Sequence, residues 1–173
     1  MANPTMTLIG LVTVGSGGAA TIDFTSIPSI YTDLCLKISY REVYASTFLT
    51  PNIYLNGVNT GTSYFGCRLE GNGTSTGSGY YTSGAKATAE NINASLSTAS
   101  VFTSAEIYIP NYAGSNNKSW SMDIVTEANA ILSYADLHAS LWSNTAAINR
   151  VTLEAPSMFA QYSTAYLYGI SNS

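Results

Sequence analysis

The chain has 173 residues, which is the size of a single domain. Hydrophobic residues make up 46% of it and charged residues only 9%, against about 25% in an average soluble protein, which excludes a disordered chain and helices with Glu/Lys surfaces. The formal net charge of −4 makes nucleic acid a poor partner.

Alternating apolar and polar residues predict short β-strands, beginning with residues 8–14 and 22–24. Pro28 predicts a connection after them, because proline cannot donate to a strand ladder. The clearest strand runs from Asp33 to Tyr44. Its apolar and polar residues fall on opposite faces, which is typical of a half-buried antiparallel strand; the apolar face holds Leu34, Leu36, Ile38 and Tyr40.

Glycine and asparagine mark the turns in the next part of the chain. A short strand at 53–55 ends at Asn56-Gly57, and this dipeptide is the strongest short signal for a hairpin turn. Another strand is predicted at 64–69. The segment 71–79 contains no apolar side chain, so we expect an exposed, flexible loop that Tyr80 and Tyr81 close.

The second half of the chain also favours strands. Residues 85–100 fit a short helix about as well as a strand, and a polar turn is expected to extend to Lys118. A helix through 125–142 is the alternative there, because Ala and Leu are good helix formers, but the alternation favours strands. The predicted strands are 105–110, 120–126, 135–142, 148–153 and 164–170.

About ten short strands with frequent turn signals are typical of a sandwich or barrel. We therefore predict an all-β chain that folds as one antiparallel β-sandwich, jelly-roll-like in arrangement. Residues 1–7 are expected to form an N-terminal arm, and residues 8–173 the sandwich domain with its exposed loop at 71–79.

One motif suggests catalysis. Residues 73–77 match G-x-S-x-G, and Ser75, Asp123 or Asp136, and His138 follow the chain order of an α/β-hydrolase. That motif requires a strand before the serine and a helix after it, whereas both flanks here are Gly/Ser/Thr-rich. A flexible loop is the better interpretation, so we expect no catalytic residues and no enzyme activity.

Metal and cofactor sites are not predicted either. His138 is the only histidine, the cysteines Cys35 and Cys67 are far apart in the sequence, and no calcium-loop motif occurs. A disulfide between the cysteines stays an open alternative to two buried thiols, as does a distant carboxylate pair of the glycosidase kind. His138 lies on the polar face of its predicted strand, and we interpret it as a surface or interface residue.

The aromatic residues are more informative about binding. Several border predicted loops or turns, where they could anchor a protein contact or stack on a sugar; the alternative is that they cover the sandwich core. Together with the N-terminal arm they give a candidate interface of Met1, Pro4, Tyr80, Tyr81, Tyr112 and Trp142.

Several segments resemble a known group of proteins in their order along the chain. They are residues 27–41, Asn56-Gly57, Tyr108-Ile109-Pro110-Asn111-Tyr112 with Lys118, residues 142–148 and Leu167-Tyr168-Gly169-Ile170. In this order they resemble small β-sandwich proteins that tailed bacteriophages encode as virion components. The resemblance implies a capsid decoration (cement) protein, a head fibre or a module of a tail fibre, and it implies no catalytic residues.

The expected function is therefore that of a decoration protein on the virion exterior that stabilises the mature shell. Its partners would be the major capsid protein and further copies of itself, as a homotrimer. The alternative is a receptor-binding or carbohydrate-binding module of a tail or head fibre, with a host-surface glycan as partner. No membrane partner is expected, since no stretch reaches the roughly 18–20 apolar residues of a membrane span and no signal peptide is visible.

Overall fold

The computed structural model describes residues 5–129 and 132–171. It confirms the all-β prediction: fourteen strands pair antiparallel in three sheets, and no helix occurs in the ranges described. None of those residues forms a helix long and apolar enough to cross a membrane.

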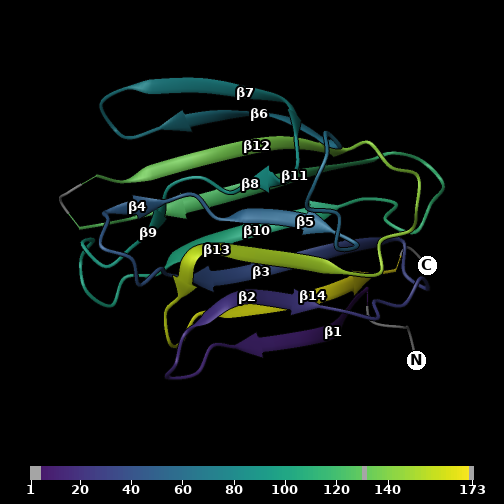
Figure 1. Cartoon of the computed structure of the whole chain (residues 1–173), viewed down its shortest axis with the longest axis horizontal. Helices are drawn as coiled ribbons and strands as arrows, with labels where there is room; N and C mark the ends of the chain where they lie inside the picture. The colour runs from purple at the N-terminus through teal and green to yellow at the C-terminus, as the bar shows by residue number, and fades with distance from the viewer. Residues whose placement is uncertain (1–4, 130–131, 172–173) are drawn as a thin grey trace.

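The larger sheet has eight strands in the order β1-β14-β3-β10-β11-β12-β6-β7 (Figure 1). Its strands join segments that lie far apart in the sequence, since β1 and β14 pair near the two ends of the chain. The bounds are β1 Met6–Thr13, β3 Asp33–Tyr40, β6 Tyr64–Gly71, β7 Thr76–Gly84, β10 Thr103–Ile109, β11 Lys118–Thr126, β12 Tyr134–Trp142 and β14 Thr164–Ile170.

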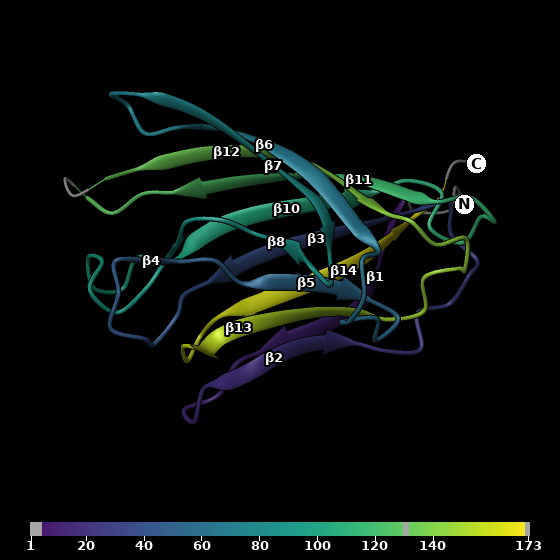
Figure 2. The same cartoon turned by 45° about the horizontal axis from the view of Figure 1, so that its top comes forward.

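The smaller sheet packs against one face of the larger sheet and completes an antiparallel β-sandwich (Figure 2). Its order is β2-β13-β5-β8, with bounds β2 Ala19–Phe24, β13 Val151–Phe159, β5 Asn52–Leu55 and β8 Ala87–Thr88. A third pairing joins the short strands β4 Phe48–Leu49 and β9 Ile92–Asn93.

The core lies between the two sheets and follows the period of two in the sequence. Leu34, Leu36, Ile38 and Tyr40 point inward from β3, as predicted, and each is at most 5% exposed. The hydroxyl of Tyr64 fastens the two sheets together, since it accepts a hydrogen bond of 2.8 Å from Leu55 N and donates one of 3.0 Å to Val58 O. The aromatic ring of Tyr64 stacks on that of Trp142.

The structure decides two alternatives that the sequence left open. Lys118–Thr126 and Tyr134–Trp142 form strands β11 and β12 rather than a helix. Within residues 85–100, only β8 and β9 are regular, and turns and bends connect them. Turns and bends precede Lys118, as expected, and Lys118 itself begins β11 and is buried.

Three local expectations are corrected. Residues 71–79 are a tight turn followed by the start of β7, in which Thr76 to Gly79 pair with Gly71 to Arg68 of β6. Met6 and Thr7, expected in an arm at 1–7, belong to β1 and pair with β14, while residues 1–4 of that expected arm lie outside the described residues. The Asn56-Gly57 turn forms with positive φ at both residues, but it carries the chain from one sheet to the other and closes no hairpin.

The two sheets differ in width, and this difference positions the candidate site. The β6–β7 hairpin projects past β8, the edge strand of the smaller sheet, in both views (Figures 1 and 2). The smaller sheet therefore covers only part of the inner face of β12, β6 and β7, and the rest of this face lies beyond the apolar core. Side chains there are free to be polar, because they do not face the apolar core.

Candidate functional site

The inner face of β12 is polar where it leaves the core. Asp136, His138 and Ser140 point inward and are at most 4% exposed. This corrects the expectation that His138 is a surface residue. The residues between them, such as Leu137 at 49% exposed, point outward, so the apolar and polar faces of this strand are reversed relative to those of β3.

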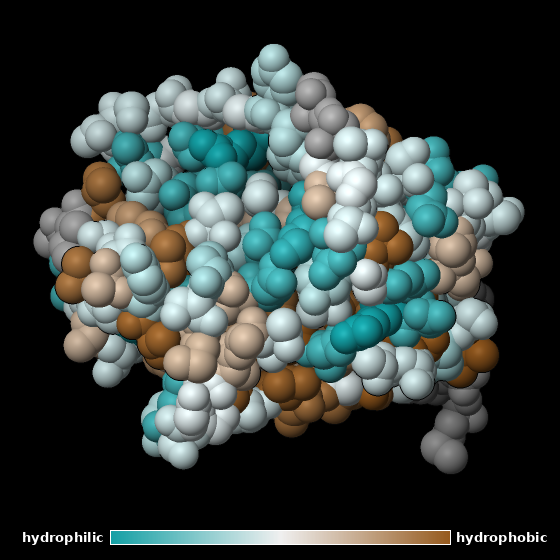
Figure 3. Space-filling view, viewed as in Figure 1, coloured by the Kyte–Doolittle hydropathy of each residue, from teal (hydrophilic) through white to brown (hydrophobic). Residues whose placement is uncertain are grey.

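A cavity of about 450 Å³ lies between this face, the β6–β7 hairpin and the segment that follows it. Figure 3, which looks onto this side of the molecule, shows a hollow lined by hydrophilic side chains beside the hairpin. Its volume is within the roughly 300–1,000 Å³ that is typical of ligand pockets. The lining residues are Arg68, Gly79, Tyr80, Tyr81, Gly84, Lys86, Thr88, Glu90 and His138; we call this the polar cavity.

Charged residues are concentrated at the polar cavity although they are rare in the chain. Arg68 lies 2.6 Å from Glu90 through Nη1 and 3.2 Å from Glu70 through Nε. Lys86 pairs with Glu154, a residue of the smaller sheet. The carboxylate of Glu90 also accepts a hydrogen bond of 3.2 Å from the hydroxyl of Thr50. The cavity wall thus carries two separate groups of ion pairs, Arg68 with Glu70 and Glu90, and Lys86 with Glu154.

The floor of the cavity contains a neutral imidazole. Burial, together with the positive charge of Arg68, lowers the pKa of His138 to about 4, so its ring is uncharged at neutral pH. Neither ring nitrogen has a hydrogen-bond partner among the residues that the structure describes. Next to it, burial raises the pKa of Asp136 to about 6, while a hydrogen bond from Asn91 acts in the opposite direction.

A glycine and a tyrosine shape one side of the cavity. The hydroxyl of Tyr81 lies 3.1 Å from Ser140 Oγ, which ties β7 to β12 across β6. A Cβ atom at Gly66 would lie 2.5 Å from the hydroxyl oxygen of Tyr81, so only glycine leaves room for this ring. Tyr81 therefore belongs to the cavity wall and not to a loop edge.

The serine of the hydrolase motif and the histidine that would act as its base do not lie together. Ser75 lies in the β6–β7 turn, where its hydroxyl contacts Asn72 Oδ1 at 3.1 Å, whereas His138 pairs with Arg68 in the middle of the strands. Among the described residues, no three His, Cys, Asp or Glu side chains are placed to hold a metal ion. Cys35 is buried, Cys67 is exposed, and both are free thiols.

The structure separates the aromatic residues of the candidate interface. Tyr80 is 81% exposed and remains available for a contact. Tyr112 and Trp142 are fully buried, which corrects their assignment to the surface: Tyr112 donates a hydrogen bond to Pro28 O, and Trp142 packs in the core. Met1 and Pro4 lie outside the described residues.

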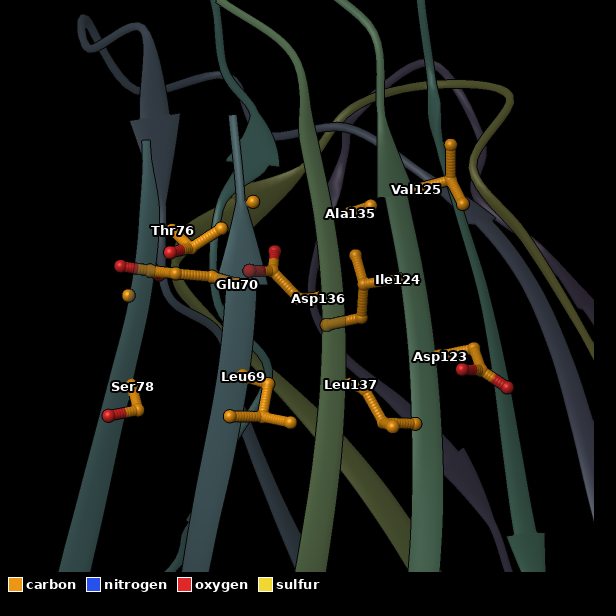
Figure 4. A pocket seen from close by; sticks show the side chains of 12 residues that line it. Leu69, Glu70, Thr76, Ser78, Asp123, Ile124, Val125, Ala135, Asp136 and Leu137 are labelled. Atoms are coloured by element: carbon orange, nitrogen blue, oxygen red, sulfur yellow. The ribbon is translucent and has the colours of Figure 1, made fainter. Parts of the chain in front are cut away.

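The outward face of the same end of the sheet is apolar. Leu69 is 61% exposed, Leu137 49% and Val125 58%, and together they form what we call the outer apolar face. Leu69 and Leu137 are cross-strand partners in one row with Ser78 and Asp123 (Figure 4). This row lies along an open trough of about 680 Å³. Sequence reasoning missed this face because it assumed that the leucines point into the core.

Comparisons with protein-family models, with curated proteins and with solved structures found no match to the chain.

Proposed function

We propose that the chain is a structural virion protein of a tailed phage, most consistent with a capsid decoration protein that docks on the major capsid protein through its outer apolar face. Such a protein stabilises the shell by mass action, because it binds the assembled lattice in preference to the free subunits. Self-association as a trimer would add avidity to each contact.

The outer apolar face carries this proposal. Antiparallel sheets that face water normally turn polar residues outward, yet Leu69, Leu137 and Val125 are among the most exposed apolar side chains in the described chain. Asp123 is the charged neighbour in this row. An exposed apolar patch of this kind marks an interaction surface, and an open one with few charged groups suits a protein lattice better than a small ligand.

The first experiment is to measure the copy number of the chain in purified virions by quantitative mass spectrometry against the major capsid protein. A simple ratio with hundreds of copies supports a lattice protein. A few copies favour a fibre, and absence from the virion contradicts both assignments.

A matched pair of variants tests the docking face. Leu137→Asp places a charge in the outer apolar face, while Ile30→Asp places the same charge on a 76% exposed residue in the connection between β2 and β3. We expect Leu137→Asp to weaken binding to shells that lack the protein by about tenfold or more, and Ile30→Asp to leave it unchanged. Equal binding by the two variants would contradict this docking face.

A receptor-binding or carbohydrate-binding module of a tail or head fibre is the second candidate. The polar cavity favours it, because a lattice contact through the outer apolar face gives that cavity no role.

A further inference from the structure

We infer that the polar cavity is a binding site for a neutral sugar, held between the β6–β7 hairpin and the segment that carries Glu90. This inference does not depend on where the protein sits in a virion, because the cavity lies on the opposite side of the large sheet from the outer apolar face. The site is formed by one chain and needs no partner copy.

The wall of the cavity supplies both halves of a hydroxyl-binding pair. Arg68 and Glu90 are fixed against each other at 2.6 Å, and their side chains keep 29% and 19% exposure. A sugar hydroxyl can therefore donate to the carboxylate of Glu90 and accept from the guanidinium of Arg68. The ion pair holds both groups in place before the ligand arrives, which reduces the entropy lost on binding.

The floor adds a group that suits a hydroxyl rather than a charge. A neutral imidazole has one donor and one acceptor nitrogen, and both nitrogens of His138 lack a partner among the described residues. The His138 side chain is 1% exposed, and it lines the cavity. Burial without a hydrogen bond is unfavourable for an imidazole, and a ligand hydroxyl could satisfy one of its two nitrogens, either as donor or as acceptor.

The charges select the class of ligand. The cavity and its first neighbours contain two cations against four carboxylates: Arg68 and Lys86 against Glu70, Glu90, Asp136 and Glu154. An anionic ligand such as a sialic acid or a phosphate would be repelled by this balance. The ring of Tyr81 provides an apolar surface beside the polar groups of the cavity. A pyranose ring matches this combination, because it has an apolar C–H face and polar hydroxyls at its edge.

The test is a titration of the full chain with neutral sugars, followed by NMR of its backbone amides. The probes are glucose, galactose, mannose and N-acetylglucosamine, with N-acetylneuraminic acid as the charged comparison. We expect at least one neutral sugar to bind at millimolar concentration or below and to shift amides of β6, β7 and β12. Binding of none of the neutral sugars, or tighter binding of the charged one, overturns the inference.

Two matched variants locate the site. Glu90→Gln removes a charged acceptor from the cavity wall, and Glu106→Gln makes the same change in an exposed ion pair with Lys37 on the outer face of the same sheet. We expect Glu90→Gln to weaken sugar binding roughly tenfold and Glu106→Gln to leave it unchanged. If Glu90→Gln does not fold, Thr88→Val, which removes a hydroxyl of the cavity wall, replaces it. Equal affinity in the cavity variant and in Glu106→Gln overturns the inference.

Discussion

Lys118 shows how a single residue can fix a turn from inside the protein. The residue is 1% exposed, and its ammonium donates to the backbone carbonyls of Gly114, at 2.7 Å, and Asn116. It also reaches the carbonyl of Thr145, so one side chain joins the loops that precede β11 and follow β12. Burial lowers the pKa of this lysine, yet the carbonyl oxygens compensate for the lost water.

Replacing this lysine tests that role. Lys118→Met keeps the length of the side chain but leaves the carbonyls without their donor, so we expect the free energy of unfolding to fall by about 2–3 kcal/mol. Lys37→Met is the control, because Lys37 forms an exposed ion pair with Glu106 that contributes less than about 1 kcal/mol. Urea denaturation of both variants measures the difference, and similar losses would show that the carbonyls do not depend on Lys118.

At the scale of an element, the β6–β7 hairpin depends on the side chain of Asn72. Its Oδ1 accepts hydrogen bonds from the backbone N–H groups of Thr74, at 3.1 Å, and Ser75, at 2.8 Å. Gly73, which follows Asn72, has a φ of +86°, which glycine adopts without strain. These contacts close the turn, which lies in the segment that the sequence predicts to be a flexible loop.

We expect Asn72→Ala to loosen this hairpin. Loss of the two backbone contacts should lower stability by about 1 kcal/mol and speed hydrogen exchange of the β7 amides more than that of the β3 amides. Ser75→Ala is the matched control, since it removes only the hydroxyl contact to the same oxygen and keeps both backbone bonds. If the two variants exchange alike, the backbone contacts do not hold the turn.

The sequence allows the period of a strand to be predicted more securely than its inward face. For β3 both are confirmed, because Leu34, Leu36 and Ile38 have no polar competitor on their face. For β12 the period is confirmed but the leucines point outward. The signal that could have revealed this is Trp142, which shares the phase of His138 and is fully buried against Tyr64.

The polar cavity could not be predicted, because it depends on the whole molecule. It forms where an eight-stranded sheet extends past a four-stranded one, and the sequence does not show which distant strands pair. For that reason nothing in the sequence brings Arg68 and Glu90 together. Their proximity follows from the order β12-β6-β7 and from the return of the chain through β8.

Two buried ionisable groups give the folded molecule opposite responses to pH. Burial raises the pKa of Glu42 from 4.5 to about 7, although backbone groups of Met158 and Ser157 lower it, so the folded state takes up a proton there. The stability that this proton provides is complete below pH 4.5 and is lost as the pH rises through 7. His138, with its pKa lowered from 6.5 to about 4, provides stability above pH 6.5 that is lost as the pH falls toward 4.

Two variants separate these contributions in the whole molecule. Glu42→Gln cannot ionise, so its free energy of unfolding should rise relative to that of the natural chain, by up to about 3 kcal/mol, as the pH goes from below 4.5 to above 7. The free energy of unfolding of His138→Gln should also rise relative to that of the natural chain, but as the pH falls from 6.5 toward 4. Urea denaturation across this range measures both differences. Curves that run parallel to that of the natural chain would show that neither group is as strongly desolvated as its burial requires. Opposite slopes would assign the carboxyl and the imidazole to the two ends of the pH profile.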